Sequence, residues 1–440
     1  MSSDAVVFIH GVGDHTPGAS VRAFVEGLLG ANLTWSVDAP APYISLSDRL
    51  DSTHELRRLH VWSDKASGRP GTDFFELYWA DLMPPLSTGE GLNWLKGLAR
   101  RPYKEMPPQM RPLWLLTRGV VVIVAAVASI VALIYGIDST ASGFGKVLRF
   151  APFAAVLGFA KGVVSSFMRS SIGDAARYLS ARPDNVAARQ AIRQRGLDLL
   201  AKLRDDGRYD RIVIVGHSLG SVIGYDLVNL AWVDGRFYYG TPPADVVPQP
   251  ALDTYEAAAA NVERHDLRVE QADVWAEQRA AGSAWLISDL ITLGSPLAHA
   301  QLVMTSGRED LRHRQLQREL TTCPPVPDVL RPGEKPTTPR RMAFAPPWDR
   351  TRRVLHLGAP FAATRWTNLY FPTRWGFSGD LIGGPVAPAF GRGVVDQAVT
   401  SDLGLMATRT PKAHSNYWTP SKGTPPKDDA LTALRTALGF

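Results

Sequence analysis

The stretch Ile212-Val213-Ile214-Val215-Gly216-His217-Ser218-Leu219-Gly220 decides the fold class of this chain. Its first four residues are β-branched and apolar, as in a buried strand of a parallel sheet. Residues 221–228 follow with apolar side chains at helical spacing. A strand, a G-x-S-x-G motif and a helix in succession predict a nucleophile elbow, a sharp turn that exposes the Oγ of Ser218 above a helix N-terminus. Gly216 and Gly220 support this turn because it is too tight for side chains beside it; the alternative is an incidental tight turn.

Strand-like and helix-like segments alternate along the chain. Strands are expected at Ala5–Ile9, Leu56–Trp62, Phe74–Trp79, Ile212–Val215, Leu286–Leu293 and Arg353–Leu357. Helices are expected at Ser20–Leu29 and Val186–Arg204, and residues 251–281 form one further charged, alanine-rich helical stretch. This alternation predicts an α/β fold with a mostly parallel sheet flanked by helices.

The expected hydrolase-like core is split into residues 1–83 and 186–440, with residues 84–185 inserted between them. A long insertion at a loop is tolerated because the entropy cost of closing a loop grows slowly with its length. Residues 321–350 are rich in proline and arginine and are expected to form an extended surface loop.

The insertion holds the most apolar part of the chain. Gly119 to Ile137 contains 19 residues without a charge, close to the ~20 that cross a bilayer as a helix. A weaker apolar segment, Val147 to Met168, contains Lys161. Basic residues flank both segments at Arg100, Arg101, Lys104, Arg111, Arg118, Lys146, Arg149 and Arg169. We expect a membrane-embedded helical hairpin with both ends on the basic, cytoplasmic side; the alternative is a pair of cap helices.

Composition limits the binding partners and the cellular compartment that we expect for this chain. The net charge of +6 would suit nucleic acid or an anionic membrane, but no nucleic-acid-binding signature accompanies it, so no nucleic-acid partner is expected. The single cysteine, Cys323, excludes an intramolecular disulfide and suits a reducing compartment. No secretory signal is expected, because Ala5–Ile9 already has the pattern of a core strand.

A serine nucleophile needs a base that removes its proton and an acid that orients that base. In a strand–elbow–helix arrangement the acid and then the histidine follow the serine along the chain. The histidines after Ser218 are His265, His299, His313, His356 and His414. His265 and His313 lie in charged helical stretches, His299 follows a strand beside the expected pocket, and His356 lies inside a strand-like run. His414, in a polar loop near the C-terminus, is therefore the expected base.

The candidate acids are Asp380, Asp396 and Asp402, since no glutamate lies between Trp375 and His414. Asp380 lies in a glycine-flanked loop after the aromatic segment 366–370, and such a loop can present a carboxylate at the end of a strand. The other two aspartates lie in an amphipathic stretch that is typical of a helix surface. We expect Asp380 to orient the base. The alternatives are Asp396 in that role and a turn-stabilising role for Asp380.

Acyl transfer also requires hydrogen-bond donors where negative charge develops on the substrate oxygen. The N–H of Leu219, directly after the expected nucleophile, is the first candidate. The second is the N–H of Val12, because His10-Gly11-Val12-Gly13 directly follows the first expected strand. Gly11 lets the backbone approach a substrate closely, and His10 is expected to brace the loop rather than to transfer a proton.

These motifs, together with Thr292-Leu293-Gly294-Ser295-Pro296-Leu297, resemble those of the α/β-hydrolase superfamily, and more narrowly of its intracellular lipases and esterases. The resemblance spans the chain in order, apart from about residues 84–185 and the Pro-rich loop. It implies an α/β-hydrolase fold and a Ser-Asp-His triad formed by Ser218, Asp380 and His414. It also implies a reaction that needs no metal and no organic cofactor.

We therefore expect a membrane-associated serine hydrolase, with its hydrolase domain in the cytoplasm, that cleaves an acyl ester of a lipid. The lipid follows from the expected location, because an anchored active site meets substrates concentrated in the bilayer. A soluble ester, thioester or peptide is the alternative substrate, since one triad serves all acyl transfers. The alternative outside enzymology is a membrane scaffold on a hydrolase-like frame.

Overall fold

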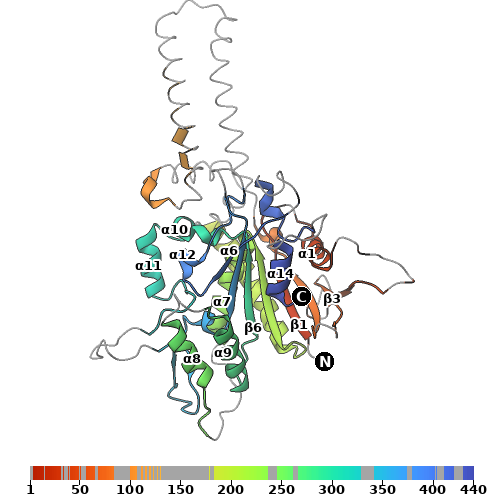
Figure 1. Cartoon of the computed structure of the whole chain (residues 1–440), viewed down its shortest axis with the longest axis vertical. Coiled ribbons are helices and arrows are strands. Elements are labelled where there is room, and N and C mark those ends of the chain that lie inside the picture. The colour runs from red at the N-terminus through yellow and green to blue at the C-terminus, as the bar shows by residue number, and fades with distance from the viewer. Residues whose placement is uncertain are drawn as a thin grey trace, which may run out of the picture.

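The computed structural model describes residues 3–13, 15–30, 33, 38, 40–48, 50, 56–64, 68–83, 100–106, 111, 114–115, 118–119, 122, 126, 129, 178, 183–235, 245–260, 266–328, 341–373, 379–401, 403, 411–420 and 430–440. Within these ranges the chain forms a central sheet with helices on both faces (Figure 1). The α/β architecture expected from the alternating segments is confirmed.

The main sheet of the described residues has eight strands in the spatial order β10-β9-β6-β5-β1-β4-β3-β2. Their bounds are β1 (Ser3–Ile9), β2 (Ile44–Ser47), β3 (Arg57–Val61), β4 (Gly71–Leu77), β5 (Arg211–His217), β6 (Ile287–Leu293), β9 (Arg365–Tyr370) and β10 (Val395–Ala398). Neighbours from β4 through β1, β5, β6 and β9 to β10 pair in parallel. Strand β3 runs antiparallel to β4, and β2 runs antiparallel to β3. The mostly parallel sheet is thus confirmed.

Alternate residues of the central strands feed two cores, one on each face of the sheet, because successive side chains of a strand point to opposite faces. Ile212 and Ile214 of β5 pack in the core beneath α6 (Pro183–Asp205), α7 (Leu219–Gly235), α8 (Pro250–Ala259) and α9 (Arg268–Ala280). Val213 and Val215 pack in the opposite core, beneath α1 (Ala19–Leu29) and α14 (Ala430–Leu438). The sheet is therefore buried on both sides.

Shorter elements connect these layers. The remaining described elements are α10 (Ala300–Val303), α11 (Arg308–Leu316), α12 (Ala387–Phe390), the 3-10 helices η1 (Ala80–Leu82), η2 (Tyr103–Glu105), η4 (Pro296–His299), η5 (Pro360–Ala362) and η6 (Pro411–Ser415), and a two-stranded sheet of β7 (Ala343–Phe344) and β8 (Val354–Leu355). The start of β1 and the end of α14 lie side by side (Figure 1), because Arg211 pairs with Asp4 and also donates to the carbonyl of Leu438.

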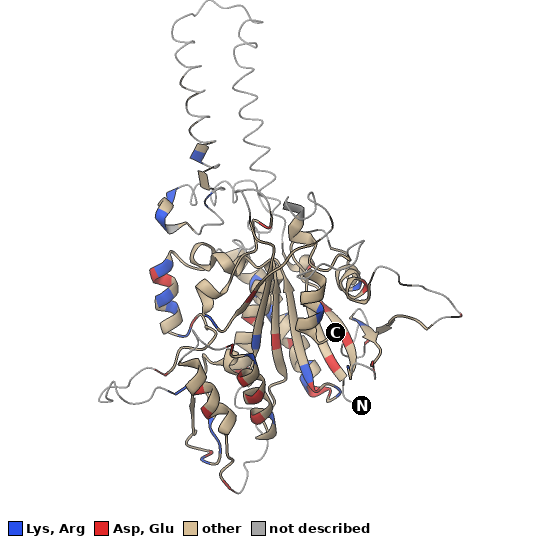
Figure 2. Cartoon of the chain, in the orientation of Figure 1, with Lys and Arg blue, Asp and Glu red and all other residues tan. Residues whose placement is uncertain are grey.

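Three local expectations need correction. The expected strand Arg353–Leu357 is only the two-residue β8 outside the main sheet. Residues 251–281 form two helices, α8 and α9, rather than one stretch. Asp396 lies in β10 and not on a helix, because hydrogen bonding to β9 overrides a pattern too short to show its period. Residues of both charges occur along α11, and acidic residues are prominent on α9 (Figure 2).

The expected transmembrane helix is not among the helices that the structure describes. Across the described ranges, no helix is both long enough and apolar enough to cross a bilayer. The expectation rested on uncharged runs flanked by basic residues, and it is corrected by this finding. Most of residues 113–168 lie outside the described residues.

The described part of the insertion is attached to the core. Arg101 donates to the carbonyl oxygens of Gln301 (3.1 Å) and Thr305 (3.4 Å), next to α10. Trp114 in turn donates its indole N–H to the carbonyl of Arg101 at 3.0 Å. The described strands of the main sheet come from residues 3–77 and 211–398, on either side of the insertion.

Candidate active site

Ser218 occupies the sharp turn between β5 and α7. Its φ of 53° lies in the left-handed region, which non-glycine residues adopt at a cost of about 1–3 kcal/mol. Its N–H donates to the carbonyl of Leu293 at 2.9 Å, and its carbonyl accepts from the N–H and the Oγ of Ser221 at 3.0 and 2.5 Å. The turn is therefore held from both sides in the strained form that the motif predicts. Its buried Oγ has no hydrogen-bond partner among the described residues.

The two glycines of the motif are required by close packing. A methyl group on the α-carbon of Gly220 would overlap the carbonyl of Ile9 at the end of β1, and one on Gly216 would overlap the carbonyl of Gly220. Helix α7 therefore begins directly against the end of the neighbouring strand. This contact is the physical reason for the glycine spacing around Ser218.

Asp380 and His414, the expected acid and base, are brought together. His414 Nδ1 lies 2.9 Å from Asp380 Oδ2, and Asp380 is fully buried. Its Oδ1 accepts from the N–H groups of Ile382 (2.8 Å) and Gly383 (2.9 Å), and its Oδ2 accepts from the Tyr417 hydroxyl (2.7 Å). Burial alone raises the pKa of Asp380, but attraction to His414 and these hydrogen bonds outweigh burial and hold the pKa below its usual range.

An ionised Asp380 fixes the tautomer of His414. Because a carboxylate only accepts hydrogen bonds, His414 Nδ1 must carry the proton that lies between them. In the neutral imidazole, Nε2 is then free of a proton and can accept one. The pair is therefore arranged as a base with an orienting acid.

Tyr417 is a member of this network that sequence reasoning missed. Its hydroxyl donates to Asp380 and accepts from the N–H of Phe371 at 3.2 Å. Burial, followed by the negative charge of Asp380, raises the pKa of Tyr417 well above its usual range. The phenol therefore stays protonated and remains a donor. Its position three residues after His414 was the available signal, but spacing alone does not show which way a loop side chain points.

The end of β6 joins the nucleophile to the acid–base pair. Leu293 accepts the hydrogen bond from the Ser218 N–H, and the next residue, Gly294, has a φ of 57°. A methyl group on Gly294 would lie 2.7 Å from Asp380 Oδ2 and 2.9 Å from His414 Nδ1. Ser218 and the pair thus both adjoin the short backbone segment Leu293–Gly294. A direct Ser218–His414 hydrogen bond is not formed, since the serine Oγ has no partner in the described part of the chain.

The segments that carry the expected oxyanion donors adjoin Ser218. A methyl group on Gly11 would lie 3.0 Å from the Cβ of Ser218, so the loop after β1 contacts the elbow. Val12 is the next residue in that loop. Leu219 is the first residue of α7, and such an N–H has no acceptor within its own helix. Both candidate N–H groups therefore belong to segments that contact the nucleophile.

His10 holds the loop in one orientation. Its Nδ1 donates to the carbonyl of Gly11 at 2.7 Å, and its Nε2 accepts from the N–H of Trp79 at 3.3 Å. The ring also stacks on the Trp79 indole at 5.1 Å. Burial lowers the pKa of His10 to about 4, so it is neutral and has one donor and one acceptor, as these contacts need. Because a trans peptide directs its N–H opposite to its carbonyl, the Val12 N–H points away from His10.

The alternative candidates have structural partners. Asp396 accepts from Asn368 (2.7 Å) and from the N–H groups of Val386 and Ala387 (both 2.8 Å), and so holds the start of α12. His356 donates from Nε2 to the Val326 carbonyl at 3.0 Å, as a core histidine would. The other predicted candidates are placed as follows: His313 on α11, His299 buried at the end of η4, and His265 and Asp402 outside the described residues.

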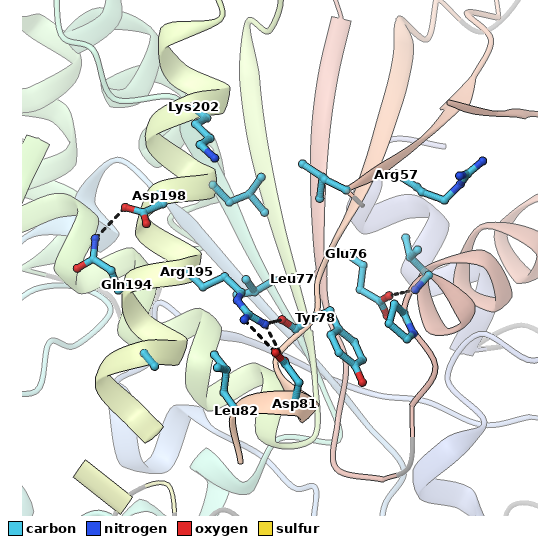
Figure 3. Close-up of a pocket in the computed structure, with 16 residues that line it drawn as sticks. Arg57, Glu76, Leu77, Tyr78, Asp81, Leu82, Gln194, Arg195, Asp198 and Lys202 are labelled. Carbon is cyan, nitrogen blue, oxygen red and sulfur yellow. Dashed lines mark hydrogen bonds and ion pairs between the residues drawn. The ribbon is translucent and has the colours of Figure 1, made fainter. Parts of the chain in front are cut away.

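A cavity of about 1000 Å³ lies between α1, β4 and α6 (Figure 3). Arg195 forms a bidentate ion pair with Asp81 at 2.7 and 3.0 Å there, and Glu76 accepts from the N–H of Gly18 at 2.5 Å (Figure 3). Burial raises the pKa of Glu76. None of Ser218, Asp380 and His414 lines this cavity, so it is not assigned to their chemistry.

Within the ranges that the structure describes, no group of three or more His, Cys, Asp or Glu side chains is placed to hold a metal ion. Comparison with known proteins gave no match to a family model, to a curated protein or to a solved structure.

Proposed function

We propose that this chain is a serine hydrolase that cleaves acyl esters, with Ser218 as nucleophile, His414 as base and Asp380 as the acid that orients it. The proposal is supported above all by one observation: the strained Ser218 and the Asp380–His414 pair meet at the end of β6. A buried histidine–carboxylate pair beside a serine in a left-handed turn is the arrangement that acyl transfer requires.

The proposed reaction begins when the Ser218 Oγ attacks the ester carbonyl carbon and His414 Nε2 takes the hydroxyl proton. The carbonyl π electrons move to oxygen, and the N–H groups of Val12 and Leu219 donate hydrogen bonds to the resulting anion. As the carbonyl re-forms, the C–O bond to the alcohol breaks and His414 returns the proton to the departing oxygen. Water, deprotonated by His414, then attacks the acyl carbon. The bond from that carbon to the Ser218 Oγ breaks, His414 returns the proton to this oxygen, and the acid is released.

The proposed substrate class is an acyl ester, without a commitment to lipids. We expected a lipid substrate because we expected a membrane location, and that expectation has been corrected. Lipid esters are therefore one group of substrates in the test panel described below. A thioester would pass through the same steps with a thiol as leaving group.

The test is a hydrolysis panel of p-nitrophenyl esters, acyl thioesters, glycerides and phospholipids, with wild type and Ser218→Ala. We expect at least one ester to be cleaved by wild type and turnover to fall by three orders of magnitude or more in the variant. His414→Ala is expected to behave alike, whereas His313→Ala, an exposed histidine on α11, keeps wild-type turnover. A folded wild type that cleaves none of these acyl compounds would overturn the proposal.

A further inference from the structure

His217, the residue just before Ser218, contacts the segment that carries His414. Its Nε2 lies 2.7 Å from the backbone carbonyl oxygen of His414, and the two rings have centroids 4.8 Å apart. The side chain is only 8% exposed. It therefore connects two segments that are 197 residues apart in sequence, at the point where they must cooperate.

The hydrogen bond has a defined direction. Burial, followed by repulsion from His414, lowers the pKa of His217 to about 3, so the ring is neutral and carries one N–H. A carbonyl oxygen can only accept, so that proton is on Nε2. The Nδ1 atom faces the α-carbon of Gly11, where a methyl group would approach to 3.0 Å. The ring thus lies between the loop after β1 and the loop that carries His414.

Packing around the ring restricts its movement. Trp418 makes an edge contact with His217 at a centroid distance of 5.0 Å, and it also packs on Phe8 and Phe24 at 5.6 and 5.9 Å. These phenylalanines belong to the fully buried core on the α1 side of the sheet. The position of His217 is consequently fixed by the fold and not by the His414 loop alone.

We propose that His217 is a positioning residue, which sets the separation of the Ser218 hydroxyl and the His414 imidazole by holding the backbone of His414. It is covalently joined to the nucleophile and hydrogen-bonded to the residue that carries the base. This role rests on the proposed function. Asp380 controls the orientation of the His414 ring, whereas His217 controls where the backbone beneath that ring lies. Displacement of a reacting group by about 1 Å can reduce a rate by about 100-fold.

The test compares His217→Met with His217→Gln, two side chains of matched length of which only glutamine can donate to the His414 carbonyl. With p-nitrophenyl butyrate or the best ester of the panel, His217→Met is expected to lower kcat by about 10- to 100-fold and to leave KM within threefold. Glutamine is expected to restore kcat to within about threefold of wild type. A residue needed only for folding would not separate kcat from KM in this way, and thermal unfolding of both variants monitors the fold.

A second measurement uses the wild-type protein and so does not depend on a variant that folds. Histidine side-chain 15N NMR at pH 7 is expected to show His217 as the neutral tautomer with its proton on Nε2. A proton on Nδ1, a His217→Met variant with wild-type kcat, or equal losses in the Met and Gln variants would each overturn the role of His217. Labelling by a fluorophosphonate separates the two proposals. An unlabelled wild type counts against the proposed function itself. A labelled wild type together with an unimpaired His217→Met variant counts only against the positioning role of His217.

Discussion

Asp380→Asn is the most informative single substitution at this site, because it changes the charge and leaves the shape almost unchanged. The asparagine Oδ1 can still accept from the N–H groups of Ile382 and Gly383. Its amide nitrogen then faces His414 Nδ1, where a carboxylate oxygen had accepted. Because the amide donates, it stabilises the His414 tautomer that has its proton on Nε2. That tautomer cannot take the proton of Ser218.

The size of the effect follows from this change of tautomer. Substitutions of this kind in a Ser-His-Asp arrangement lower kcat by about 10⁴, which corresponds to about 5 kcal/mol of activation free energy. We expect KM to change less than threefold, because Asp380 is fully buried and does not reach a substrate. The loss of charge-assisted hydrogen bonds from His414 and Tyr417 is expected to lower the free energy of unfolding by about 1–3 kcal/mol.

The assay is steady-state ester hydrolysis, with urea unfolding measured on the same preparations. Asp396→Asn is the matched control, since Asp396 is likewise a hydrogen-bonded carboxylate, with three donors against four at Asp380, but it holds α12 and not the base. It is expected to keep kcat within about threefold. The reasoning is refuted if Asp380→Asn retains more than a tenth of wild-type kcat, or if the control loses as much activity.

Three further outcomes are expected. Tyr417→Phe removes one donor to Asp380 and leaves the Phe371 N–H without its acceptor. We therefore expect kcat to fall about tenfold and the free energy of unfolding to fall by about 1–3 kcal/mol. Unchanged kcat and unchanged unfolding free energy would contradict this hydrogen-bond network. Gly11→Ala places a methyl group 3.0 Å from the Cβ of Ser218. We therefore expect kcat to fall about 100-fold, with little change in circular dichroism. Wild-type activity in this variant would show that the loop after β1 does not approach the reacting groups. Buried neutral histidines bind protons less readily in the folded than in the unfolded chain. The free energy of unfolding should therefore decrease as pH falls from 6.5 towards 4, by up to about 1.4 kcal/mol per pH unit for each such histidine. Equal urea midpoints at pH 7 and pH 5 would argue against this burial. These histidines are His10 and His299, with pKa values lowered to about 4, and His217, with a pKa lowered to about 3.

Local patterns predicted the features that depend on neighbouring residues. The elbow at Ser218 could be predicted because its strand, glycines and helix are contiguous in sequence, and strong runs such as Ile212–Val215 gave strands near their observed bounds. The Asp380–His414 contact joins residues 34 apart. It could be inferred only because few acids and histidines follow the elbow in suitable loops.

Features that depend on tertiary contacts were missed. The edge strand β10 has four residues, three of them half-buried and one exposed, so it lacks a period long enough to recognise. The Tyr417 hydroxyl and the N–H groups of Ile382 and Gly383 converge on Asp380 only after the chain has folded. The transmembrane expectation, drawn from uncharged runs flanked by basic residues, was corrected because no helix in the described ranges is long and apolar enough to cross a bilayer.

The most direct test of the central claim, that Ser218 is a nucleophile activated by His414, is mass-spectrometric mapping of a fluorophosphonate adduct. The account predicts one modified residue, Ser218, with a labelling rate at least 100-fold lower in a folded His414→Ala variant. An adduct on another residue, or equal labelling rates for wild type and the variant, would contradict it.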